Sequence, residues 1–500
     1  MRAGDAPLSP GAAWGRRLEP LFPAWAGPGP AQGRRRVAVA AAYALSALGV
    51  AAVLLGRQPG VPAAATMWAE DGRVFYSQAV SLPFGRALLT PDNGYYQLVP
   101  RLLAELASLV RPPDAAAVMA GTGALCVAGC TVLVFRTTRA HIPAVGARLL
   151  LAAGMVLLPT ANAELVANAV NVPWWGMFAA FWLLLWRPAG WAGRAVAFSV
   201  CALVAASQPL VGLLLPLAAA RAVVLRRPSE HWAGAGLLSG LTLQLVGRLA
   251  DHHRRFLGGL HPWAGTEAFF ERAGLVLVAG QRGSDQLVHW HPVVAAGLGA
   301  LVWSGVLGGA LAFGDRRTRT FTVAAAASSV VSFYVPVWLR GLDSFLSVSP
   351  VEDGSRYALS ASLLTLSTLA VALGRRRAAP AWPSHHRALH RGPGRAGRRL
   401  LAHRPALALA LCTLALAPAW AVDLRDANMR SAGPAWGAQV ATAAATCRAG
   451  GRRWAVLRTD PAGWSARLPC SALVPGAPTT LVGPGRARSR ASGQAGPAVP

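Results

Sequence analysis

The sequence predicts an all-α polytopic membrane protein, and three observations support this fold class. Of the 500 residues, 54% are hydrophobic and only 14% are charged, which is too apolar for an ordinary soluble domain of this length. Apolar runs of about 17 to 22 residues recur, and at 1.5 Å per residue such a run crosses a hydrocarbon core of roughly 30 Å. Arginines gather in alternate connections between these runs. The chain is therefore expected to cross a lipid bilayer several times.

About eleven transmembrane helices are expected, within a range of nine to twelve. The first, 37–55, follows three arginines, and its length favours an uncleaved signal anchor over a signal peptide. The pair 194–207 and 209–225 is broken by Gln208 and Pro209, so it is either one kinked helix or a re-entrant pair. The ten spans after the first lie at approximately 115–135, 146–160, 172–186, 194–207, 209–225, 232–250, 291–313, 320–339, 357–373 and 405–422.

The charge distribution predicts the orientation of these spans. The chain has a net charge of +28, and all its short connections on one side are basic, for example at Arg136, Arg187, Arg226 and Arg316. The positive-inside rule therefore predicts a cytoplasmic N-terminus in the cell membrane and, with eleven spans, an external C-terminus. Most of the 20 acidic residues then face outside. The basic charge thus indicates membrane orientation, with the lipid bilayer and no nucleic acid as partner.

Four segments are expected along the chain. Residues 1–36 are predicted to be a disordered cytoplasmic tail, 37–422 a transmembrane domain, 423–474 a small external region and 475–500 a second disordered tail. Cys447 and Cys470 are the two cysteines expected outside, so a disulfide is predicted between them. The other four cysteines lie within spans and are expected to be small core residues.

The first external loop, 56–114, holds the most informative residues. Glu70 and Asp71 follow the first span directly, and such a pair is either a hydrated loop or the acid–base centre of a membrane enzyme. Further along the loop, leucines at helical spacing between 98 and 110 alternate with polar residues such as Arg101. This pattern predicts a helix that either lies in the membrane interface or packs on the bundle.

Two further external regions contain candidate ligand-binding residues. Five histidines fall between 251 and 291, but no pair has the spacing of a helical zinc site, so neither a metal ion nor another cofactor is expected. Glu352 and Asp353 repeat the Glu-Asp-Gly pattern, and Arg356 and Tyr357 follow at the membrane boundary. Carboxylates bind hydroxyl groups and arginine binds phosphate, as a sugar phosphate requires.

Together these patterns resemble the GT-C superfamily of membrane glycosyltransferases and its high-GC bacterial relatives. The resemblance covers roughly 37–422. It rests on the order and sidedness of these elements and on short motifs that include residues 68–72, 94–95, 100–102, 168–175 and 354–357. It implies transfer of a sugar from a polyprenyl-phosphate donor to an envelope glycan, lipid or protein acceptor on the outer face. The alternative is a multi-pass transporter or lipid-linked-sugar flippase, although such proteins usually place ionisable groups within the spans.

The resemblance also implies roles for particular residues. Asp71 is expected to be the general base, with Glu70 placing the loop or contacting the acceptor. Trp174 is expected either to stack on a sugar ring or to belong to the interfacial aromatic belt. The residues expected to bind substrate are Arg356, Tyr357, Glu352, Asp353, Glu164, Asn168, Asn171, Trp174, Tyr95 and Arg101.

Overall fold

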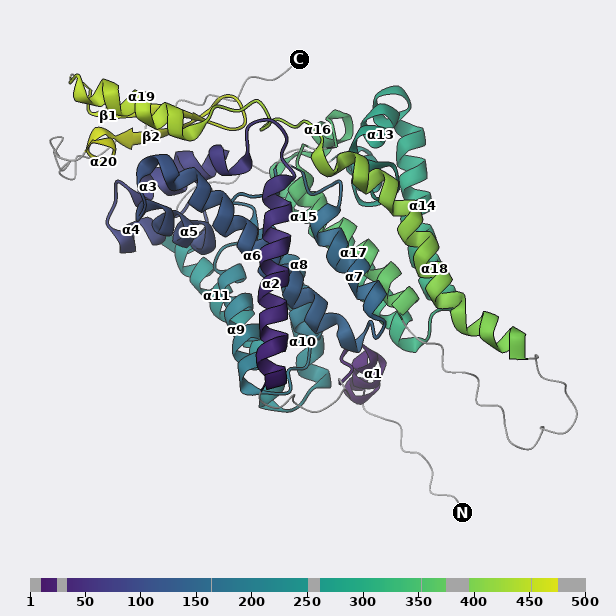
Figure 1. Cartoon of the computed structure of the whole chain (residues 1–500). Helices are drawn as coiled ribbons and strands as arrows, with labels where there is room; N and C mark the ends of the chain where they lie inside the picture. The colour runs from purple at the N-terminus through teal and green to yellow at the C-terminus, as the bar shows by residue number, and fades with distance from the viewer. Residues whose placement is uncertain are drawn as a thin grey trace, which may run out of the picture.

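The computed structural model describes residues 10–24, 34–162, 164–250, 261–351, 353–374, 395–450 and 452–474, with only the backbone described at 10–13, 34, 250 and 395–405. Within this part of the chain the structure is helical apart from one two-stranded sheet (Figure 1). The long helices are α2 (Arg34–Gly56), α6 (Ala115–Thr137), α11 (Trp232–Ala250), α14 (Pro292–Phe313), α15 (Arg316–Arg340), α17 (Ser355–Gly374) and α18 (Arg395–Val422). Shorter apolar helices are α7 (Val145–Leu157), α8 (Val172–Leu185), α9 (Trp191–Ala205) and α10 (Leu215–Val224). The prediction of an all-α bundle is confirmed at this level.

Each predicted span coincides with a helix, but not all of these helices have the length of a full span. Six segments are long and apolar enough to cross a bilayer: Arg35–Gly56, Pro112–Ala140, Pro292–Phe313, Arg316–Arg340, Ser355–Gly374 and Ala406–Arg425. α7, α8 and α9 are shorter apolar helices, as is the segment Pro209–Val224. A helical membrane protein is thus supported, while the number of eleven spans stays a prediction.

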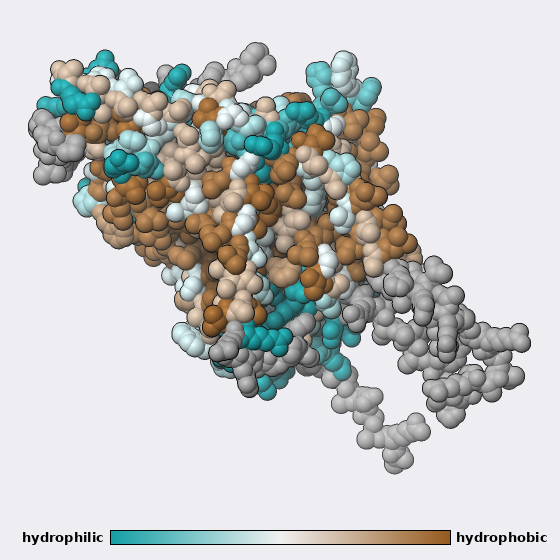
Figure 2. Space-filling view, viewed as in Figure 1, coloured by the Kyte–Doolittle hydropathy of each residue, from teal (hydrophilic) through white to brown (hydrophobic). Residues whose placement is uncertain are grey.

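Hydrophobic side chains form a broad band between two polar ends of the molecule (Figure 2). We call the end that carries the loop 56–114 and the chain after α18 the upper face, and the opposite end, where α2 begins, the lower face (Figure 1). Large apolar side chains such as Leu45, Leu301 and Val323 are exposed on the outside of the bundle. α8 and α17 lie at its centre and are buried on nearly all sides. A surface of this kind is stable in contact with lipid chains, which supports the lipid bilayer as a partner.

The interruption at Gln208 separates two helices. α9 ends at Ala205, a 3₁₀ segment runs from Pro209 to Leu214, and α10 begins at Leu215. The Gln208 side chain accepts a hydrogen bond from the Leu210 amide, and Pro209 has no amide proton to continue the helix of α9. The interpretation as a single kinked helix is therefore wrong.

Part of the N-terminal segment is ordered, which corrects the prediction of a disordered tail through residue 36. Residues 10–18 form α1 (Pro10–Leu18) at the lower face (Figure 1). Leu21 and Phe22 follow and insert into the main core with exposed fractions of 3% and 2%. The His141 ring Nε2 lies 3.1 Å from the Leu21 carbonyl oxygen. Residues 1–9 and 25–33 of this predicted tail lie outside the described residues, as does the predicted tail 475–500.

A second core joins the first loop to the chain after α18. The loop contains a π-helical turn (Asp71–Tyr76), α3 (Ser77–Ala79), α4 (Phe84–Leu88) and α5 (Leu98–Ser108). The C-terminal region contains α19 (Trp436–Arg448), β1 (Trp454–Thr459), β2 (Trp464–Pro469) and α20 (Cys470–Leu473), with β1 and β2 antiparallel. Phe75 and Tyr76 of the loop share one buried cluster with Trp436 and Leu457 of this region. The predicted disulfide between Cys447 and Cys470 is confirmed.

The predicted helix in the first loop is confirmed as α5, and its leucine face is turned outward. Leu102, Leu106 and Leu109 are 37%, 46% and 80% exposed, whereas Ala104 and Ala107 are fully buried. An apolar face that the protein itself does not cover is typical of a helix in the membrane interface. The remaining helices at the upper face are α12 (Pro262–Phe270), α13 (Val276–Trp290) and α16 (Asp343–Val348).

Candidate functional site

Glu70 and Asp71 are adjacent in sequence but differ in their surroundings. Asp71 is 1% exposed, and its two carboxylate oxygens accept hydrogen bonds from the amides of Ala169 and Val170, each at 2.8 Å. Burial raises the pKa of Asp71 to about 7, although these two hydrogen bonds and the charge of Arg430 favour the ionised form. Asp71 thus fastens the first loop to the loop before α8, and it is not open to a substrate.

The backbone around this pair is held by the C-terminal region. The Ala69 amide donates to the Asp460 carbonyl at 2.6 Å, and the Asp460 amide donates to the Met67 carbonyl at 2.9 Å. Gly72 is needed for this close approach, because a Cβ there would lie 2.6 Å from Thr459 Cγ2. The π-helical turn begins at Asp71, and such turns are frequent at functional sites. The Glu-Asp-Gly pattern of the first loop is therefore explained by packing as much as by chemistry.

Glu70 is half-buried and lies within electrostatic range of Arg356. Burial raises its pKa above the usual 4.5, the Arg356 charge lowers it, and Asp92 and Glu164 add smaller increases. A carboxylate with a raised pKa within electrostatic range of a fixed cation has the properties of a general base. Of the adjacent pair, the geometry therefore favours Glu70 over the expected Asp71 for contact with a substrate.

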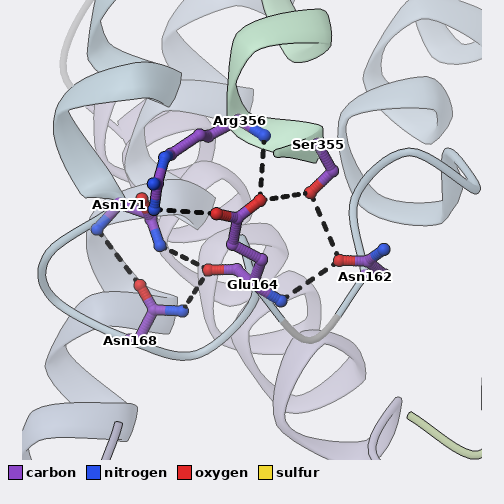
Figure 3. A network of polar contacts seen from close by, with 6 residues as sticks. All are labelled: Asn162, Glu164, Asn168, Asn171, Ser355 and Arg356. Atoms are coloured by element: carbon purple, nitrogen blue, oxygen red, sulfur yellow. Dashed lines mark hydrogen bonds and ion pairs between the residues drawn. The ribbon is translucent and has the colours of Figure 1, made fainter. Parts of the chain in front are cut away.

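Arg356 is held by Glu164 in a network at the upper end of α17 (Figure 3). Arg356 Nη1 lies 2.8 Å from Glu164 Oε1, and their side chains are 30% and 10% exposed. The other carboxylate oxygen accepts from the Ser355 hydroxyl at 2.9 Å and from the Arg356 amide at 3.2 Å. With both Glu164 oxygens engaged, the guanidinium is positioned in advance, yet part of it remains open.

The three asparagines in Figure 3 shape the loop that carries Glu164. Asn168 Nδ2 donates to the Glu164 carbonyl at 2.7 Å, and Asn171 Nδ2 donates to the same oxygen. Asn162 Oδ1 accepts from the Glu164 amide at 3.1 Å and from the Ser355 hydroxyl at 3.3 Å. Asn168 and Asn171 are each 1% exposed, so their function is to hold the loop rather than to bind sugar hydroxyls.

Trp174 and Tyr357, the residue after Arg356, pack against each other. Their rings meet edge to face with centroids 5.4 Å apart, and they are 6% and 4% exposed. The neighbouring Trp175 is fully buried and donates its indole N–H to the Leu165 carbonyl at 3.1 Å. Both tryptophans are therefore core residues, which agrees with neither the aromatic-belt nor the sugar-stacking interpretation.

A tight turn in the first loop brings Tyr95 into electrostatic range of Arg356. The amides and carbonyls of Asp92 and Tyr95 are hydrogen-bonded to each other at 3.0 and 3.2 Å, with Asn93 and Gly94 both at positive φ, as a type I′ turn requires. Burial raises the pKa of Tyr95 to about 12, against the charges of Arg340 and Arg356. Tyr95 and Asp92 therefore lie within electrostatic range of these arginines.

Arg340 was missed by the sequence analysis. It is the last residue of α15 and is exposed. Burial raises the pKa of Asp92, and Arg340 is one of the charges that oppose this increase. The sequence feature that could have indicated this residue is an arginine at the acid-rich end of a span, where the positive-inside rule expects few basic residues. We call Glu70, Asp92, Glu164, Arg340 and Arg356 the arginine–carboxylate cluster.

The remaining predicted residues lie apart from this cluster or support it. Arg101 is 2% exposed and donates to Gln78 Oε1 and to the Ala87 carbonyl, both at 2.6 Å, so it is part of the loop scaffold. Asp353 is half-buried, and burial raises its pKa while Arg272 lowers it. Glu352 lies outside the described residues.

No group of three or more metal-ligating side chains is found among the residues that the structure describes, although 251–260, with two of the predicted histidines, fall outside them. Comparison of the chain with family models, with curated proteins and with solved structures gave no match in any of the three.

Proposed function

We propose that this protein is a membrane glycosyltransferase that moves a sugar from a polyprenyl-phosphate donor to a hydroxyl acceptor at its upper face, which we take to be external. The observation that carries the proposal is Glu70, a half-buried carboxylate within electrostatic range of Arg356, whose guanidinium Glu164 holds at 2.8 Å. A base and an anchored cation at the end of a membrane span are the two groups that this transfer needs.

The proposed reaction assigns one step to each group. Glu70 takes the proton of the acceptor hydroxyl while the hydroxyl oxygen forms a bond to the anomeric carbon. The bond between that carbon and the phosphate oxygen breaks, and the polyprenyl phosphate leaves with the electron pair as an anion. Arg356 and Arg340 stabilise the negative charge that develops on the phosphate. The raised pKa of Glu70 makes it a better proton acceptor near neutral pH than an ordinary glutamate.

A narrow apolar cavity of about 20 Å³ lies below the cluster. It is lined by α8, by the 3₁₀ segment before α10, and by α15 and α17, for example at Phe178, Leu214, Val331 and Leu364. Ser360, which also lines it, is four residues after Arg356 on α17 and therefore about one helical turn below it. The volume of this cavity admits about one water molecule, so the lipid chain of the donor must lie elsewhere on the protein.

Donor binding by Arg356 tests the proposal. Purified protein would be titrated in detergent micelles with a fluorescent polyprenyl-phosphate sugar. Arg356→Gln should weaken binding about 10- to 100-fold, as loss of a charge-assisted hydrogen bond implies. Arg111→Gln is the matched control, because Arg111 is also at the upper face but contacts only Asp114 through an exposed ion pair at 2.9 Å.

Since Arg356→Gln leaves Glu164 without its ion pair, Arg340→Gln provides a second test at an exposed position of the same cluster. Both variants should retain the melting temperature of the wild type within a few degrees if they are to be compared. Wild-type affinity in both folded variants would overturn the proposal. Movement of the labelled lipid across proteoliposomes without sugar transfer would favour the transporter.

A further inference from the structure

A second site lies at the lower face, at the opposite end of the molecule from the arginine–carboxylate cluster. It is a cavity of about 1150 Å³ between the ordered N-terminal segment, the end of α10 and the start of α15. Its lining includes six arginines and three acidic residues: Arg16, Arg187, Arg226, Arg227, Arg316, Arg317, Glu19, Glu230 and Asp315. The cavity thus has an excess of positive charge.

Two of the three acidic residues are already occupied. Glu230 pairs with Arg187 at 3.0 Å and with the buried Arg221 at 3.7 Å. Asp315 caps α15 by accepting from the Thr318 amide at 2.8 Å and the Thr318 hydroxyl at 2.9 Å. Both carboxylates therefore already have partners within the protein.

Four arginines of the lining have no such partner. The side chains of Arg16, Arg226, Arg227 and Arg317 are exposed and take part in none of the hydrogen bonds or ion pairs of the described residues. Arg316 differs, because it donates to the Arg16 carbonyl at 2.7 Å. Four such guanidinium groups around one cavity, against the one unpaired carboxylate of Glu19, are suited to a multiply charged anion such as a phosphate.

The walls of the cavity indicate where that phosphate comes from. Phe22, Val223, Val224 and Leu225 also line it, so cations and apolar side chains meet in one space. Val223 is 52% exposed, and Trp14 of the adjacent α1 is 60% exposed. Exposed apolar side chains and tryptophan beside arginines are typical of the boundary between lipid chains and headgroups. A free phosphate would gain nothing from the apolar wall, whereas the acyl chains of a lipid would cover it.

We propose that this cavity binds the headgroup phosphate of an anionic phospholipid of the lower leaflet. Arg226, Arg227 and Arg317 hold the phosphate, and the acyl chains lie against Val223 and its apolar neighbours. The bound lipid connects the N-terminal segment to α10 and α15, which stabilises the lower end of the bundle. The site is independent of the proposed glycosyl transfer.

Native mass spectrometry of the full-length protein tests this proposal. The protein would be released from micelles that contain either dioleoyl phosphatidylglycerol or dioleoyl phosphatidylcholine. Phosphatidylglycerol should remain bound at one molecule per protein and phosphatidylcholine should not. The triple variant Arg226→Gln, Arg227→Gln, Arg317→Gln should weaken phosphatidylglycerol binding about 100-fold. The matched triple Arg35→Gln, Arg136→Gln, Arg319→Gln removes the same charge from arginines outside this lining and should bind like the wild type.

Each contrary result is distinct. Equal losses in the two triples would mean that only the overall charge matters, which overturns the site. If sodium pyrophosphate in lipid-free micelles raised the melting temperature of the protein as much as phosphatidylglycerol does, the assignment to a lipid would be overturned. If the triple variant does not fold, the exposed single variant Arg317→Glu replaces it, and wild-type affinity in that variant would likewise contradict the proposal.

Discussion

At the scale of single residues, two neighbouring carboxylates have separated functions. Asp71 is buried and both its oxygens are bonded to backbone amides, while Glu70 is half-buried and lies near Arg356. The sequence could predict that only one of an adjacent pair faces a substrate, because neighbouring side chains diverge. It could not predict which one, since that choice depends on the loop before α8, nearly 100 residues away in the chain.

Asp71→Asn should lower the stability of the fold rather than act on chemistry. An asparagine offers one acceptor in place of two, so the amide of Ala169 or Val170 loses its partner in a buried place. The expected cost is about 1–3 kcal/mol. It would be measured as a lower melting temperature in detergent, with Asp114→Asn as an exposed control. An unchanged melting temperature would argue against this structural role.

At the scale of elements, the first loop and the C-terminal region form one unit. Arg430 is 1% exposed and donates to the Thr66 hydroxyl at 2.7 Å and to the carbonyls of Ala63, Thr66, Val166 and Ala167. Burial lowers its pKa to about 10, while the charges of Asp71 and Asp460 raise it. One side chain thus joins three segments that are far apart in sequence.

Arg430→Gln should therefore loosen this unit. The change leaves several buried carbonyls without a donor and Asp71 without a nearby cation, at an expected cost of about 3–5 kcal/mol. Hydrogen exchange should become faster in α19 and in both strands, and the melting temperature should fall. Arg448→Gln, at an exposed position of α19, serves as the control. Equal exchange in the two variants would contradict the role assigned to Arg430.

The elements themselves were predictable where the signal was local. Long apolar runs gave the helices, and the two external cysteines gave the disulfide. The ordering of residues 10–24 was not predictable, because their composition is that of a disordered tail and their order depends on a binding surface for Leu21 and Phe22. Arg340 was missed for a similar reason, since its partners belong to other elements.

At the scale of the whole molecule, polar residues gather at both ends of a hydrophobic band (Figure 2). The free arginines of the lower cavity and the arginine–carboxylate cluster lie at opposite ends. This separation is what the positive-inside rule predicts for a cytoplasmic lower face. The orientation itself remains a prediction from charge.

Single cysteines test that orientation directly. Asn93→Cys at the upper face and Arg319→Cys at the lower face would each be introduced into a chain with Cys126, Cys130, Cys201 and Cys412 replaced by alanine. In intact cells a membrane-impermeant maleimide should label the first and not the second. Labelling of the second cysteine alone would indicate the opposite orientation. Labelling of both would contradict the placement of the two positions on opposite sides of the membrane.

The central claim is that Glu70 is the base of a glycosyl transfer. The most direct measurement is the transfer of labelled sugar from polyprenyl phosphate in proteoliposomes across a range of pH. The proteins compared are the wild type, Glu70→Gln and the control Glu267→Gln, which makes the same change at another half-buried upper-face site. The base must be ionised to act, and burial raises its pKa above 4.5, so the wild-type rate should rise with pH through that higher value. Glu70→Gln should lose about 10²–10⁴-fold in rate together with this dependence, while Glu267→Gln keeps both. A Glu70→Gln protein that transfers sugar at the wild-type rate would contradict the account.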